Sequence, residues 1–102
     1  MTKEIEAKLK PLYHYDNSGE KPIAVLKYFD PTGNWTWYAA EGQKQDDGDW
    51  LFWGAVDGFE FECGYFTLSE LQHAKEGCTG LKALPIERDL YFSSTPLKEL
   101  RR

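Results

Sequence analysis

Asn34-Trp-Thr-Trp-Tyr-Ala-Ala-Glu41 and Asp49-Trp-Leu-Phe-Trp-Gly-Ala-Val56 are the two stretches of sequence that decide the fold. Both are rich in aromatic and β-branched residues, which favour the pleated, half-buried surface of a β-sheet. Asp57-Gly58 follows the second stretch and separates it from Phe59-Glu-Phe-Glu-Cys-Gly-Tyr-Phe66. Because a two-residue Asp-Gly loop is the preferred type I′ hairpin turn, the strands on either side of it are predicted to pair antiparallel.

This turn also predicts the register of the hairpin, and with it the face on which each side chain lies. The expected cross-strand pairs are Val56 with Phe59, Gly54 with Phe61, Phe52 with Cys63 and Trp50 with Tyr65. Trp50 and Phe52 are therefore predicted core residues. Trp53 is predicted on the opposite, solvent-side face, next to the carboxylates of Glu60 and Glu62.

A helix is predicted to begin directly after the third strand, at Thr67-Leu-Ser-Glu70. This pattern is a capping box, in which the Thr67 hydroxyl accepts from the N3 amide and Glu70 reaches back to the cap amide. Leu68, Leu71 and Ala74 then recur at a spacing of three, which gives an apolar stripe that can pack on the sheet. Gly77 is expected to end this helix.

The other elements are predicted from local composition and turn residues. They are a helix over Thr2–Leu9, a connecting loop over Pro11–Pro22, a first strand over Ile23–Phe29, a type I turn over Asp30–Gly33, a polar surface loop over Gly42–Gly48, a fifth strand over Pro85–Phe92 and a C-terminal helix opened by Thr95-Pro96. In the first hairpin, the four-residue turn places Tyr28 opposite Trp35, and both are predicted to belong to the core.

Arg88 lies on the predicted core side of the fifth strand, together with Ile86 and Leu90. A charged side chain in that place requires an acidic partner or a route to solvent, so a structural ion pair is expected. The succession of hairpins and helices predicts an α+β domain with a mainly antiparallel sheet of about five strands. That sheet is predicted to be built from two hairpins plus a C-terminal strand, with the helices packed on one face, and residues 1–102 are expected to form a single domain.

The sequence contains no apolar run of membrane-spanning length and no N-terminal signal pattern, so a cytoplasmic protein without a membrane partner is expected. Cys63 and Cys78 are then expected to be free thiols. The net charge of −5 is concentrated in residues 41–62, where one lysine stands against seven acids. Such a segment either serves only as a solvated face or meets a basic partner.

These residues give little support to metal binding, catalysis or nucleic-acid binding. Asp46-Asp-Gly-Asp49 lacks the ligand spacing of a calcium loop, and no metal or cofactor is predicted. Glu60 and Glu62 are an acid–base pair for a small hydrolase only if a cleft perturbs them, since acids spaced by two on an exposed strand are ordinarily just solvated. Single-stranded nucleic acid or a small ligand could stack on Tyr38 or Trp53, but the acidic surroundings repel phosphate.

The sequence therefore favours a non-enzymatic interaction module over an enzyme. Its acidic and aromatic face is hypothesised to bind a protein with a basic surface, because carboxylates can occupy the Lys and Arg positions of a groove that normally holds phosphate. The hypothesised partner-binding residues are Tyr38, Asp46, Asp47, Asp49, Trp53, Glu60 and Glu62.

Five stretches of the chain together carry a resemblance to a known family. They are Thr2-Lys-Glu-Ile-Glu-Ala, Pro11-Leu-Tyr13, Asn34-Trp-Thr-Trp-Tyr-Ala39, Gly64-Tyr-Phe-Thr-Leu-Ser-Glu-Leu71 and Leu84-Pro-Ile-Glu-Arg-Asp-Leu-Tyr-Phe92. Over nearly its full length the chain resembles a bacterial domain-of-unknown-function family, numbered 2958, that is met on plasmids, integrated elements and phages. The resemblance implies a mobile-element setting, in which an accessory to DNA transfer, an inhibitor of a host defence nuclease or a protein-binding regulator is expected. It implies no catalytic residues.

Overall fold

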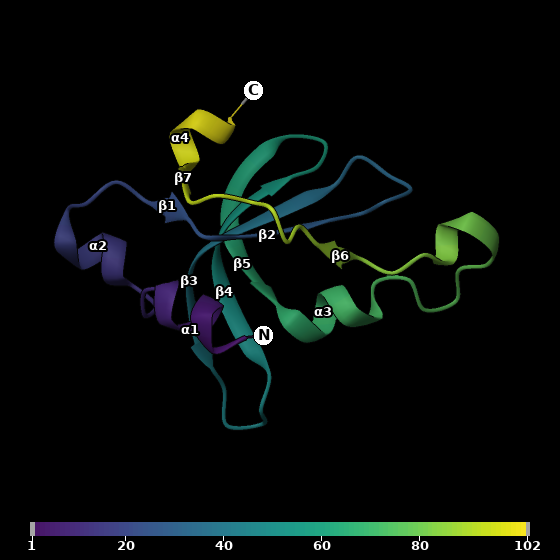
Figure 1. Ribbon diagram of the computed structural model, residues 1–102, viewed down its shortest axis with the longest axis horizontal. Helices are drawn as coiled ribbons and strands as arrows, with labels where there is room; N and C mark the ends of the chain where they lie inside the picture. The colour runs from purple at the N-terminus through teal and green to yellow at the C-terminus, as the bar shows by residue number, and fades with distance from the viewer. Residues whose placement is uncertain (1, 102) are drawn as a thin grey trace.

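The computed structural model has a central sheet with short helices packed around it (Figure 1). It describes residues 2–101 apart from the side chains of residues 81 and 82. In chain order the elements are α1 (Lys3–Lys8), α2 (His14–Ser18), β1 (Ile23–Ala24), β2 (Leu26–Phe29), β3 (Thr36–Lys44), β4 (Trp50–Asp57), β5 (Phe61–Thr67), α3 (Leu68–His73), the 3-10 turn η1 (Gly80–Ala83), β6 (Glu87–Arg88), β7 (Thr95–Pro96) and α4 (Leu97–Leu100).

The main sheet has five antiparallel strands in the order β5-β4-β3-β2-β6. A separate two-stranded sheet joins β1 to β7. The predicted α+β class, the five-stranded antiparallel sheet and the two hairpins are thus confirmed. The predicted fifth strand is reduced to two residues, and the predicted loop between Pro11 and Pro22 contains the helix α2.

The predicted register of the β4–β5 hairpin is wrong by three residues. Asp57 pairs with Phe61, so the connecting loop has three residues, and Gly58 does not adopt the positive φ of a type I′ turn. An odd shift exchanges the two faces of a strand. Phe52 therefore pairs with Phe66, while Tyr65 lies beside Trp53 on the opposite face.

The first hairpin keeps its predicted faces, although its register also differs. Tyr28 pairs with Trp37 and not with Trp35, because a six-residue connection replaces the predicted four-residue turn. A shift by two leaves every side chain on the same face. The turn at Asp30 does form, with the Gly33 amide donating to the Asp30 carbonyl at 3.3 Å.

One face of the sheet carries the larger hydrophobic core, centred on the fully buried Phe52. Helices α1 and α3 cover this face (Figure 1), and the ring of Trp50 stacks on Phe52 with their centroids 6.2 Å apart. The buried members of this core are Leu9, Leu26, Tyr28, Ala39, Phe52, Phe66 and Leu71. Trp50 itself is only half-buried.

The opposite face is also covered, which corrects the expectation that helices pack on one face only. A second core contains the buried Ala24, Tyr38, Ala55 and Leu97, with Trp53 partly buried against it. This face is covered because of the path that the C-terminal segment takes. After β6 it crosses to this side, β7 pairs with β1, and the Leu97 amide donates to the Pro22 carbonyl at 3.0 Å.

Arg88 forms no ion pair within 4.0 Å in the described part of the chain, so the expected structural pair with an acid is not observed. Its backbone pairs with that of Tyr28 in the sheet. Burial raises the pKa of the Tyr28 hydroxyl, and the positive charge of Arg88 partly offsets this increase. The neighbouring Asp89 makes the contact with a cation instead, at 3.6 Å from the Lys27 ammonium.

The start of α3 is capped by Thr67, whose Oγ1 accepts from the Glu70 amide at 3.1 Å. The Glu70 carboxylate accepts from the Thr67 hydroxyl at 3.1 Å rather than from the cap amide, so the capping box is only half made. The helix ends at His73, and a further turn reaches Gly77, which takes a left-handed φ of 82°.

Replacing Thr67 by Ala is expected to lower the free energy of unfolding by about 1 kcal/mol, because the Glu70 amide loses its acceptor. Urea denaturation measures the loss, and amide NMR shifts should place the change in the first turn of α3. Unchanged stability together with unchanged shifts in that turn would contradict the role of the cap.

Candidate functional site at the hairpin ends

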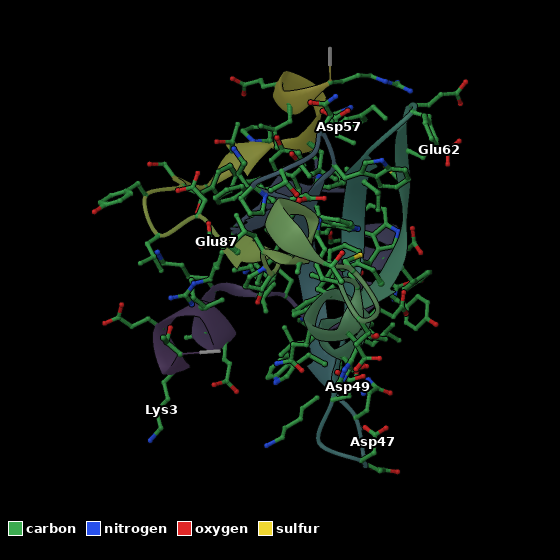
Figure 2. The ribbon with its side chains drawn as sticks, turned by 90° about the vertical axis from the view of Figure 1, so that its right-hand side faces the viewer. Lys3, Asp47, Asp49, Asp57, Glu62 and Glu87 are labelled. Atoms are coloured by element: carbon green, nitrogen blue, oxygen red, sulfur yellow. The ribbon has the colours of Figure 1, made fainter. Side chains whose placement is uncertain are left out.

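The acidic residues predicted to form one partner-binding surface lie at opposite ends of the sheet. Asp46 and Asp47 are exposed at the tip of the β3–β4 hairpin, whereas Glu60 and Glu62 are exposed in and after the β4–β5 loop. The eight residues of β4 separate these two ends by roughly 25 Å. Figure 2 shows Asp47 at one end of the molecule and Glu62 at the other.

Neither of the two aromatic residues predicted as exposed anchors is free on the surface. Tyr38 is buried, with its ring centroid 5.8 Å from that of Phe92 and 6.5 Å from that of Phe61. Trp53 is half-buried against the same second core. The second layer, which the one-sided interpretation did not include, covers Tyr38 and part of Trp53, so these two residues are not available as exposed anchors.

Asp49 is held by the start of α3. Its Oδ1 accepts from the Ser69 amide at 3.0 Å and from the Trp50 amide at 2.8 Å, and its Oδ2 accepts from the Ser69 hydroxyl. The hydrogen bonds from Ser69 hold the pKa of Asp49 below its usual value. This carboxylate therefore joins the β3–β4 hairpin to α3, and its neutralisation would disturb that junction.

Two loops that are distant in sequence meet at one end of the sheet and present an aromatic pair. Trp35 ends the β2–β3 connection and Phe59 lies in the β4–β5 loop, with ring centroids 5.5 Å apart and planes at 82°. The Trp35 ring packs directly on Gly58, where an added Cβ would lie 2.7 Å from three ring atoms. Phe59 is 95% exposed, whereas Trp35 is 38% exposed.

We call this region the hairpin-end surface. It is formed by Trp35, Val56, Phe59, Glu60 and Glu62, which together line a shallow cavity of about 250 Å³. Neither glutamate forms an ion pair with a described residue. Exposed aromatic rings and unpaired carboxylates therefore stand side by side, which is the combination that attracts a Lys or Arg side chain.

A partly buried ion pair beside this surface holds the β2–β3 connection in place. The Lys75 ammonium donates to both carboxylate oxygens of Asp30 at 2.8 Å, and to the Thr32 hydroxyl at 3.2 Å. The Lys75 hydrogen bond keeps the pKa of Asp30 below its usual value. The loop carrying Trp35 is thus anchored to the turn after α3, which reduces the ordering that binding would require.

Sequence reasoning placed both aromatic residues of this surface in the core. The assumed register put Phe59 opposite Val56, and the assumed four-residue turn put Trp35 opposite Tyr28. The sequence feature that could have indicated an exposed Phe59 is its position directly after Asp57-Gly58. A large apolar residue is atypical of turns. Glu60 and Glu62 are exposed, as predicted, but Glu62 pairs with Val56 and therefore does not share a face with Trp53.

A second polar arrangement lies at the other end of β3, around the buried Glu41. A β-bulge at Ala40 turns Glu41 to the Trp53 side of the sheet. Its two carboxylate oxygens accept from the Tyr13 and Tyr15 amides at 2.9 and 2.8 Å, which fastens the start of α2 to the sheet. Tyr13 has a φ of 68°, a left-handed conformation that is costly for a large side chain.

Replacing Glu41 by Ala is expected to cost on the order of 3 kcal/mol, because two backbone amides lose a charged acceptor at once. Glu41→Gln keeps one acceptor oxygen and should lose about half as much. Urea denaturation gives the two losses, and NMR shifts of residues 13–18 report whether α2 detaches. Equal stability of Glu41→Ala and the exposed control Glu60→Ala would contradict this role.

The described residues contain no cluster of three or more His, Cys, Asp or Glu side chains that could hold a metal ion. The thiols of Cys63 and Cys78 are free, as predicted, and both are exposed, although the predicted register placed Cys63 opposite Phe52 on the core face. Among residues 2–101, no helix is long and apolar enough to cross a membrane.

The chain belongs to the family described as "Protein of unknown function (DUF2958)", whose model matches residues 1–99. The resemblance drawn from the sequence is thereby confirmed. No curated protein and no solved structure matches the chain.

Proposed function

We propose that this member of the DUF2958 family is a non-enzymatic interaction module that binds a basic protein through its hairpin-end surface. The observation that carries the proposal is the exposed pair of Trp35 and Phe59 flanked by the unpaired Glu60 and Glu62. A cationic side chain that enters this cavity meets an aromatic face and a carboxylate together. Each contact becomes stronger as the cavity excludes water.

The partner we propose is a protein that handles nucleic acid. Such a protein has a groove lined with Lys and Arg, and carboxylates can pair with these cations in place of phosphate. The net charge of −5 and the acidic tip at Asp46 and Asp47 would attract the groove from a distance and raise the association rate. For a chain of the mobile-element type, the corresponding role is that of an anti-defence protein or an accessory to DNA transfer.

The proposal predicts different effects for aromatic and acidic substitutions. Phe59→Ala should speed dissociation of the captured partner about tenfold, since the most exposed anchor is lost from the centre of the contact. Glu60→Gln with Glu62→Gln should abolish capture at moderate salt by removing the charges that contact the groove. Asp46→Asn with Asp47→Asn, at the far end of the sheet, should only slow association a few-fold.

The unchanged chain and the three variants are each used in a pull-down from a host lysate, and mass spectrometry identifies the partner. Surface plasmon resonance then gives the association and dissociation rate constants. Asp49 is left unchanged in every variant because it holds α3. Capture must survive nuclease treatment and fall with rising salt. Unchanged capture by the Glu60→Gln, Glu62→Gln variant, or capture that nuclease abolishes, would overturn the proposal and favour an enzyme or a nucleic-acid binder.

A further inference from the structure

Strand β5 forms an edge of the main sheet. It pairs with β4 on one side, and no described residue makes a backbone hydrogen bond to its other side. Its seven residues therefore present a row of backbone donors and acceptors. An unprotected edge of this length is a template on which another extended chain can pair.

The first half of this edge adjoins the largest cavity described, with a volume of about 590 Å³. Phe61 and Cys63 of β5 form one wall, and Leu97, Lys98 and Arg101 of the C-terminal segment form the other. Its lining also includes Pro22 and Glu62. The Phe61, Leu97 and Pro22 side chains make most of the interior apolar, so an aliphatic group would gain by entering it.

Two cations border this cavity. The Arg101 guanidinium lies over the Phe61 ring, 5.9 Å from its centroid, and Lys98 lines the cavity one helical turn before it. Neither cation forms an ion pair with a carboxylate of the described chain. Glu62 pairs with Val56, so alternation along the strand directs its side chain to the other face of the sheet. The cavity is therefore apolar inside and positively charged at its border.

We propose that this groove binds the C-terminal end of an extended peptide. The peptide would pair antiparallel with β5, insert an apolar last side chain into the cavity and place its terminal carboxylate against Arg101 and Lys98. Strand addition gives affinity through backbone hydrogen bonds, and the pocket gives specificity. The free edge continues the cavity along residues 61–67, and an extended backbone can pair with it over this length. A peptide therefore fits better than an isolated small carboxylate. This site does not involve the aromatic pair of the hairpin-end surface.

The two free thiols allow a direct test with the intact chain. Cys63 lies in the proposed site, while Cys78 lines a different cavity, together with Asp30 and Trp37. The probe is an acetylated hexapeptide, Thr-Val-Thr-Val-Thr-Leu, with a free C-terminal carboxylate, and its amidated form is the matched control. Iodoacetamide labelling of each cysteine is followed by mass spectrometry, and amide NMR shifts are recorded for β5.

Saturating free-acid peptide is expected to slow labelling of Cys63 about tenfold, to leave Cys78 unchanged and to shift the amides of β5. The amidated peptide and the Arg101→Gln variant should each bind about tenfold more weakly, which corresponds to the loss of one charge-assisted hydrogen bond. Arg101 is exposed, so this variant should fold normally. Three results would overturn the proposal: equal protection by the amidated peptide, equal protection of both cysteines, or protection by octanoate without any peptide-induced shift of the β5 amides.

Discussion

Replacing Gly54 by Ala is expected to destabilise the protein by on the order of 4 kcal/mol or more. An ideal Cβ at this position would lie 1.8 Å from the Tyr38 carbonyl oxygen and 3.0 Å from the Ala39 Cα. Both are backbone atoms of the adjacent strand β3, next to its bulge, so no side-chain rotation relieves the clash. The two central strands would have to separate, and β3 and β4 make the most extensive pairing in the fold.

The matched control is Gly64→Ala, because Gly64 pairs directly with Gly54 on the neighbouring strand. An added Cβ there has no atom within 4 Å. Gly64→Ala should therefore leave stability unchanged or raise it by a few tenths to 1 kcal/mol, through the reduced freedom of the unfolded chain. Urea denaturation followed by circular dichroism measures both variants. Similar stability of the two would show that β3 and β4 do not approach as closely as described.

Replacing Phe52 by Ala is expected to cost about 4 kcal/mol, since a fully buried ring is removed from the centre of the larger core. Its ring centroid lies 5.4 Å from that of Phe66, 6.2 Å from that of Trp50 and 6.3 Å from that of Tyr28. None of these neighbours can fill the resulting cavity without leaving its own contacts. Chemical denaturation gives the loss, and near-ultraviolet circular dichroism reports the disturbed aromatic packing.

Two other aromatic residues of the same hairpin serve as controls for Phe52→Ala. Trp53→Ala should cost about 2 kcal/mol, because its ring is only partly buried against the second core. Phe59→Ala should cost less than about 0.5 kcal/mol, since the ring is 95% exposed. A negligible loss for Trp53→Ala would restore the one-sided arrangement of the sheet, and a large loss for Phe59→Ala would remove Phe59 from the candidate binding residues.

The second core limits where this protein can meet a partner. Both faces of the sheet are largely covered, by α1 and α3 on one side and by α4 with the preceding segment on the other. The surfaces left for binding are therefore the ends and the edge of the sheet. The hairpin-end surface and the β5 edge are of this kind, and substitution of Phe59 or Arg101 should affect binding without removing core contacts.

The sequence by itself determined the local structure. The aromatic composition of β3 and β4 requires a half-buried pleated surface, and the Thr67 hydroxyl starts α3 because it can accept from a nearby amide. These interactions connect residues a few positions apart and depend little on the rest of the chain. The antiparallel α+β class followed from the same signals, as did the family membership and the free thiols.

Only the tertiary structure decided which faces are buried and where the charges gather. The Asp57-Gly58 dipeptide permits a two-residue turn, but the loop in the structure has three residues, and Trp35 packs on Gly58 within it. This longer loop places Phe66 opposite Phe52. The resulting odd shift exchanged the faces of β5 and exposed Phe59. The C-terminal segment buried Tyr38, and the length of β4 separated Asp46 from Glu60. Each outcome depends on contacts between residues distant in sequence, whose energies no local pattern encodes.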